Sequence, residues 1–89
     1  MTNLINKEVL SQVKIDCRDM TPSHKRAVFN FFKVHVDNQP EVREGPSWEK
    51  MSVIYPHSQG FSNVGWDYNL DDYDCYPITL TKKDLGGLI

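Results

Sequence analysis

The sequence has few of the features that mark the larger functional classes of protein. It holds only two cysteines, Cys17 and Cys75, which form neither a C-x-x-C motif nor a metal-binding spacing. No apolar run approaches the roughly 18 residues that a membrane span needs, and the first residues lack the positive-then-apolar order of a signal peptide. We therefore expect a soluble, cytoplasmic protein with no membrane association and with both thiols reduced and buried.

Catalytic and cofactor signatures are missing as well. Gly86-Gly87 lacks the Lys and Ser/Thr of a phosphate loop, and neither Ser58 nor the cysteines lie in a nucleophile elbow. The three histidines, His24, His35 and His57, are scattered. The two on the predicted helix stand roughly 16 Å apart by the helical rise, too far for one metal ion. The expectation is a protein that is not an enzyme and that has no cofactor and no metal site.

Length and charge limit the number of domains and the kinds of partner that we expect. The 89 residues predict a single domain, 1–89, in which residues 1–12 form a loose N-terminal arm or a short helix. The formal net charge of −2 does not indicate a general nucleic-acid binder, so direct binding of nucleic acid is not expected. The charges are uneven, however. Residues 1–33 hold six Lys and Arg against three Asp and Glu, and residues 34–74 hold two against eight. Such asymmetry steers a partner over about 8–10 Å at ordinary salt.

The clearest element is a helix over residues 21–36. Thr21 is suited to the N-cap, and Pro22 to the first helical position, where its missing N–H costs nothing. The predicted apolar face consists of residues at helical spacing, Val28, Phe31, Phe32 and His35. The predicted hydrated face holds the polar residues Lys25, Arg26, Asn30 and Lys33. Pro40 ends the helix, because the residue before a proline is disfavoured in helical conformation.

Short segments with strand patterns surround this helix. They are residues 13–17, 51–55, 61–68 and 75–80. A hairpin turn is predicted over residues 57–60. Because Pro77 cannot donate to a ladder, we expect the last strand to lie at a sheet edge or to be only partly paired. The order β-α-β-β-β predicts an α+β fold, with one amphipathic helix packed on a small antiparallel sheet of three to four strands.

The most unusual stretch is the acidic and aromatic segment of residues 66–76. Its start, Asp67-x-Asn69-x-Asp71, matches the first three ligand positions of a calcium-binding loop, but Asp72 stands where glycine is needed and Ile78 where glutamate belongs. Three interpretations stay open: a solvated hairpin loop whose Asp and Asn side chains cap their own backbone, a weak cation site, or a partner-facing patch.

The partner-facing interpretation gives the leading hypothesis for function. Tyr and Trp bury a large rigid area with a polar tip at interfaces, and carboxylates around them can meet a basic groove. We therefore expect a small binding protein that contacts its partner through this segment. The predicted partner-binding residues are Trp66, Asp67, Tyr68, Asp71, Asp72, Tyr73, Asp74 and Tyr76.

Two further hypotheses use other parts of the chain. A ligand-binding module, for example for a nucleotide signal, would bind phosphate through the basic residues Arg18, Lys25 and Arg26, which otherwise form a solvated face. A structural or assembly protein would use the edge strand near Pro77.

Four segments together resemble the small accessory proteins of tailed bacteriophages. They are the first strand, the helix TPSHKRAVFNFF, the segment GPSWEKMSVIY and the C-terminal segment GWDYNLDDYDCYPITLTKKDL, and they lie between Val13 and Leu85. The likeness is one of size and style, and no family catalytic residues come with it. It implies a protein made in a bacterial cytoplasm that binds a host protein and modulates or inhibits it, often to blunt a defence.

Overall fold

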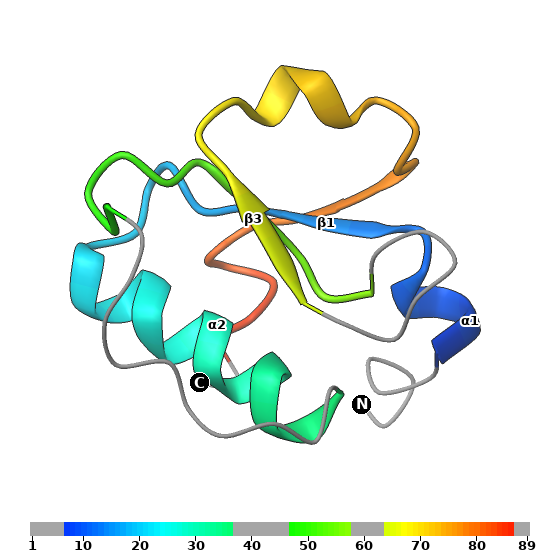
Figure 1. Ribbon diagram of the computed structural model, residues 1–89, viewed down its shortest axis with the longest axis horizontal. Helices are drawn as coiled ribbons and strands as arrows, with labels where there is room; N and C mark the ends of the chain where they lie inside the picture. Colours follow the sequence, from blue (N-terminus) through cyan, green and yellow to red (C-terminus); the bar gives the residue numbers. More distant parts are fainter. Residues whose placement is uncertain (1–6, 37–46, 58–63, 87–89) are drawn as a thin grey trace.

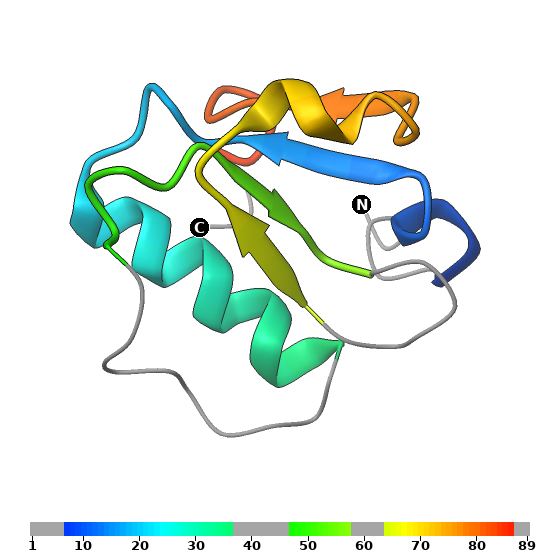
Figure 2. The same cartoon turned by 45° about the horizontal axis from the view of Figure 1, so that its top comes forward.

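The fold is a four-stranded sheet with a helix on one face. The computed structural model describes residues 7–36, 47–57 and 64–86. Its elements in chain order are α1 (Lys7–Leu10), β1 (Val13–Asp16), α2 (Pro22–His35), β2 (Val53–Tyr55), β3 (Gly65–Asp67), the 3-10 helix η2 (Leu70–Tyr73) and β4 (Ile78–Leu80). The helix α2 covers one face of the sheet, and η2 lies on the opposite face (Figure 1, Figure 2).

The strand order β3-β2-β1-β4 confirms the predicted α+β architecture and changes one detail of it. β2 pairs antiparallel with both β1 and β3, as expected. β4, however, runs parallel to β1, with Val13 opposite Ile78, so the sheet is mixed. A parallel pair needs a crossover and not a hairpin, and residues 68–77 supply it by crossing the outer face of the sheet. β4 is an edge strand, as Pro77 predicted.

Helix α2 begins as predicted. The Thr21 hydroxyl accepts a hydrogen bond from the backbone N–H of His24 at 3.2 Å, and Pro22 occupies the first turn. The buried face is rotated by comparison with the prediction: Phe29 is buried, Phe31 is only partly buried, and His35 is exposed. Phe29 packs edge-on against the ring of Trp48 at 5.6 Å between centroids, so the aromatic contact of the helix is made on this rotated face. The predicted end of the helix, at residues 37–40, lies outside the described residues.

The main core lies between α2 and the inner face of the sheet. In the register of the strands, Ile15 stands opposite both Ile54 and Leu80, and Ile54 stands opposite Trp66. Ile15 and Ile54 are fully buried, and Trp66 packs against them at the rim. Each fully buried aliphatic side chain of this kind contributes about 1.5–3 kcal/mol relative to its exposed state.

Lys25 corrects the prediction of a hydrated helix face. Its side chain is buried, and its Nζ donates to the carbonyl oxygens of Glu49 at 3.0 Å and Met51 at 2.6 Å. The Met51 oxygen also accepts from Cys17 Sγ at 3.5 Å. Lys25 sits one turn before Val28 and Phe29 on the buried face, so its aliphatic stem packs there while the ammonium group meets backbone oxygens.

The two cysteines have different environments. Cys17 is buried, as predicted, and burial raises the pKa of its thiol to about 11. Cys75 is exposed, so the expectation of a second buried thiol is wrong. The reason is that β4 begins at Ile78, which leaves Cys75 in the turn that follows η2.

The remaining predicted segments have mixed outcomes. Residues 7–10 form a single helical turn, which agrees with the short helix expected within residues 1–12. The predicted hairpin turn falls largely on residues 58–60, outside the described part of the chain. At the C-terminal side, the Asp84 carboxylate accepts from the backbone N–H of Thr81 at 2.8 Å and closes a tight turn over residues 81–86.

Candidate functional site

The outer face of the sheet is covered by the segment that carries the acidic and aromatic residues. Tyr55 of β2 stacks on Tyr73 with 4.7 Å between ring centroids, and the ring centroid of Tyr76 lies 5.8 Å from that of Tyr55. Lys14 of β1 points to the same face, where it is 9% exposed and its Nζ donates to the Tyr73 carbonyl at 3.0 Å. The three tyrosines and the stem of Lys14 therefore form a second, smaller core that fastens the segment to the sheet.

A carboxylate completes this attachment. The Tyr73 hydroxyl donates to Asp67 Oδ2 at 2.5 Å, and the backbone N–H of Tyr68 donates to Asp67 Oδ1 at 2.6 Å. The hydrogen bond from Tyr73 holds the pKa of the Asp67 carboxyl below its usual range. Burial, and then the bond to Asp67, raise the pKa of Tyr73 above its usual range. At neutral pH Asp67 is therefore ionised and Tyr73 protonated, so that Asp67 acts as an anchor within the fold.

Three other carboxylates point outward from η2 and the residue after it. We call Asp71, Asp72, Tyr73 and Asp74 the acidic ridge. Asp71, Asp72 and Asp74 are exposed, and Tyr73 is half-buried between them. Asp74 lies 3.9 Å from Lys14 Nζ with its side chain 91% exposed, whereas Asp71 and Asp72 form no salt bridge within the described residues.

The local geometry explains why the ridge forms. Asn69 is the N-cap of η2, and its side-chain oxygen accepts from the backbone N–H of Asp71 at 3.1 Å. This confirms the expectation that Asx side chains cap their own backbone here. The segment is a crossover and not the predicted hairpin loop, because β4 pairs with β1 at the far side of the sheet. Leu70 is buried and fixes the start of η2.

Four predicted partner-binding residues lie outside the ridge: Trp66, Asp67, Tyr68 and Tyr76. Tyr76 is 6% exposed, so in the free protein its side chain lies beneath the ridge and not on the surface predicted to contact a partner. Trp66 and Tyr68 lie 5.0 Å apart between ring centroids, with Trp66 packed against the main core on the α2 side. Tyr68 is 47% exposed, and its hydroxyl accepts from the backbone N–H of Ser47 at 3.2 Å. Because alternate residues of a strand point to opposite faces, Trp66 and its neighbour Asp67 are separated by the sheet.

The basic residues predicted for a phosphate ligand do not come together. Arg18 makes a two-pronged contact with Asp16, at 2.9 Å from Nε and 2.8 Å from Nη2, and this contact lowers the pKa of the Asp16 carboxyl. Lys25 is buried against backbone carbonyls, as described above. Arg26 is exposed on α2. The structure therefore gives these three residues no common site.

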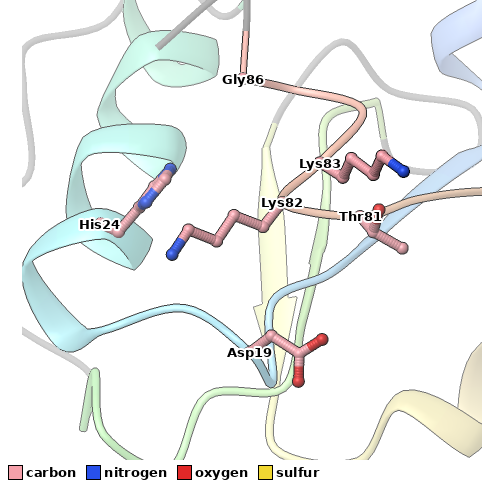
Figure 3. A pocket seen from close by; sticks show the side chains of 6 residues that line it. All are labelled: Asp19, His24, Thr81, Lys82, Lys83 and Gly86. Carbon is pink, nitrogen blue, oxygen red and sulfur yellow. The ribbon is translucent and has the colours of Figure 1, made fainter.

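A different basic site lies beside the first turn of α2. A pocket of about 660 Å³ separates this turn from the turn over residues 81–86 (Figure 3). Its lining residues are Asp19, His24, Thr81, Lys82, Lys83 and Gly86. Figure 3 shows the side chain of Lys82 extending toward His24, while Lys83 points away from it. His24 and the residues of this turn lie more than 50 positions apart in the sequence, so only the fold brings them together.

Comparisons with other proteins add no relatives. The searches against protein-family models, curated proteins and solved structures each give no match for this chain. Within the described ranges, no three His, Cys, Asp or Glu side chains are grouped so that they could hold a metal ion. In the same residues, no helix has the length and apolar character that a membrane span requires.

Proposed function

We propose that this protein is a non-enzymatic binding protein whose acidic ridge engages a basic surface of a partner protein. The observation that carries the proposal is that three exposed carboxylates lie on a segment whose backbone is held in place by hydrogen bonds. Tyr73, at the centre of the ridge, is bound through both its hydroxyl and its carbonyl group. Carboxylates presented on a segment already ordered in the free protein lose less conformational entropy on binding than those of a flexible loop.

The charges of the ridge define the partner. Asp71 and Asp72 have no cationic neighbour in salt-bridge contact within the described residues, so they are available to an external Lys or Arg. A basic partner surface would be attracted at a distance and oriented on contact. The sequence resemblance to phage accessory proteins supports a host protein as the partner, with modulation or inhibition of a defence as the outcome.

A pull-down with a charge-neutral variant tests the proposal. Tagged wild type and the Asp71→Asn/Asp72→Asn/Asp74→Asn variant are incubated with bacterial lysate, and captured proteins are identified by mass spectrometry. The variant keeps the size and shape of each side chain, removes its negative charge and replaces one acceptor oxygen with an NH2 donor. We expect a protein with a basic surface to be captured by the wild type and lost by the variant, with capture weakening as salt is raised.

A second variant tests the effect of removing negative charge elsewhere on the surface. Asp19→Asn/Glu49→Gln removes two exposed carboxylates that lie outside the ridge, and it should capture the same partner as the wild type. Equal capture by the wild type and by the ridge variant would contradict the proposal. Equal loss in both variants would show that overall charge, and not the ridge, is responsible.

A further inference from the structure

We propose that the pocket between the first turn of α2 and the turn over residues 81–86 binds a small phosphorylated molecule that carries hydroxyl groups. This site is independent of the acidic ridge. Its lining residues come from the loop before α2, from the first turn of α2 and from the segment after β4, whereas the 3-10 helix that carries the ridge lies on the opposite face of the sheet (Figure 1).

His24 gives the first reason for a ligand in this pocket. Its Nε2 atom is buried and has no hydrogen-bond partner within the described residues. A buried imidazole nitrogen without a partner is uncommon in native proteins, and such atoms are ordinarily satisfied by another group or by an ordered molecule. The backbone N–H of His24 donates to the Thr21 hydroxyl, so this bond leaves the imidazole unused.

Positive charge gives the second reason. The Lys82 side chain extends toward His24 (Figure 3), and neither Lys82 nor Lys83 forms a salt bridge within the described residues. The pocket also adjoins the N-terminal end of a 14-residue helix, where the helix dipole is positive. The carboxylate of Asp19 points away from His24 and Lys82. The end of the pocket at Lys82 therefore carries positive charge, which suits a phosphate group.

The size and the other lining groups define the rest of the ligand. A pocket of about 660 Å³ is larger than a bare phosphate ion requires and falls in the range of organic ligand sites. Asp19 and Thr81 offer oxygen atoms that can accept hydrogen bonds from hydroxyl groups. Apart from the imidazole of His24, the lining residues include no aromatic ring on which a nucleobase could stack. The chemistry therefore favours a compact, hydroxylated phosphate ester over a nucleotide held by its base.

An NMR titration at low ionic strength tests this site. The probes are ribose 5-phosphate, ribose and inorganic phosphate, each added to the uniformly ¹⁵N-labelled protein up to about 10 mM, which is tenfold above a roughly millimolar Kd. We expect ribose 5-phosphate to shift the amide signals of Asp19, His24 and residues 81–86. Inorganic phosphate should bind at least about fivefold more weakly, and ribose should not bind in this range.

Variants separate the pocket from general charge effects. Lys82→Gln and His24→Ala should each weaken ribose 5-phosphate binding by about fivefold or more, since each removes one group from the cationic end. Arg26→Gln removes one positive charge from an exposed position on α2 outside the pocket and should leave binding unchanged. Lys82 is exposed, so its variant keeps the test valid if His24→Ala fails to fold.

Several results would overturn the inference. The inference would be wrong if ribose 5-phosphate did not bind, or if inorganic phosphate bound as tightly as ribose 5-phosphate. It would also be wrong if Lys82→Gln kept the wild-type affinity, or if Arg26→Gln lost as much affinity as Lys82→Gln. None of these outcomes bears on the acidic ridge, whose own test uses different residues and a protein partner.

Discussion

Lys14 and Lys25 show at the scale of single residues how burial decides the role of a charge. Both lysines stand where the sequence pattern places polar side chains, and both are nearly buried. Each donates its ammonium group to backbone carbonyls, Lys14 to Tyr73 and Lys25 to Glu49 and Met51. A buried charge is tolerated only where such partners replace water. The two lysines therefore hold segments together, and they are not free to meet a ligand.

Replacing Lys25 by methionine should lower the free energy of unfolding by about 1–3 kcal/mol. The methionine fills a similar volume, but it removes the Lys25 hydrogen bonds to the Glu49 and Met51 carbonyls. Urea denaturation followed by circular dichroism measures the change. Arg26→Met, at the neighbouring exposed position, is the control and should change stability by less than about 0.5 kcal/mol. A similar loss in both variants would show that the buried hydrogen bonds of Lys25 contribute little.

Removing the Tyr73 hydroxyl should produce a pH-dependent loss of stability. Tyr73→Phe deletes the bond to Asp67, and we expect a cost of about 1 kcal/mol at pH 7, since the pair is partly exposed. Because the folded pKa of Asp67 is lowered, its contribution is complete above the unfolded value of about 3.9 and is lost as pH falls through the folded pKa. The difference between wild type and variant should therefore shrink below about pH 4.

Tyr68→Phe is the matched control for this pH dependence. The Tyr68 hydroxyl accepts from a backbone N–H and not from a titrating group, so any cost of its loss should be the same at pH 7 and pH 3. Urea midpoints at the two pH values give the comparison. A cost of Tyr73→Phe that does not change with pH would mean that the bond to the ionised Asp67 is not what stabilises the fold.

At the scale of elements, the β2–β3 pair depends on a glycine beneath an aromatic ring. Tyr55 stands opposite Gly65 in the register of the two strands. A Cβ atom at residue 65 would overlap the Tyr55 ring, so the ring lies directly over the glycine. The same ring stacks on Tyr73. One small residue in β3 therefore permits the contact that fastens the crossover segment to the sheet.

Gly65→Ala should destabilise the protein by about 1–3 kcal/mol, because the added methyl group displaces the Tyr55 ring from its stack. Gly86→Ala is the control, since a Cβ there meets its nearest atom at the ordinary distance of 3.4 Å. Thermal unfolding compares the two. In a Tyr55→Ala background the cost of Gly65→Ala should fall toward zero, and a full cost there would assign it to the backbone alone.

At the scale of the whole molecule, the sheet is covered on both faces by different kinds of packing. α2 and the aliphatic strand residues form the main core, while tyrosines, Lys14 and Asp67 form the polar layer under the acidic ridge. The ridge carboxylates themselves contribute little to the fold, since their side chains are exposed. The two layers thus divide the molecule into a part that provides stability and a surface that is available for binding.

The Asp71→Asn/Asp72→Asn/Asp74→Asn variant should accordingly fold with a stability within about 0.5 kcal/mol of the wild type. The 3.9 Å approach of Asp74 to Lys14 is solvent-exposed on the Asp74 side and adds little. A thermal melt and an NMR spectrum check this expectation. The control Asp19→Asn/Glu49→Gln should behave in the same way. A large loss of stability in the ridge variant alone would mean that the carboxylates serve the fold.

Local signals in the sequence predicted most of the elements and part of the candidate site. The cap at Thr21, the alternation in residues 13–17 and the edge position after Pro77 were all confirmed, because each depends on neighbours in the chain. The exposure of Asp71, Asp72 and Asp74 followed from composition in the same way. The basic ligand site predicted at Arg18, Lys25 and Arg26 was not assembled, because burial of Lys25 is a tertiary effect.

The sequence by itself determined the α+β class, the helix and the acidic character of the segment before β4, since capping, periodicity and charge act over a few residues. Only the tertiary structure decided that β4 pairs parallel with β1, which carries the acidic segment across the outer face of the sheet. That crossover turns Tyr76 inward and leaves the ridge outside. The same topology places residues 81–86 beside His24. Contacts between residues some sixty positions apart depend on the packing of the whole chain. Local sequence patterns therefore do not predict them.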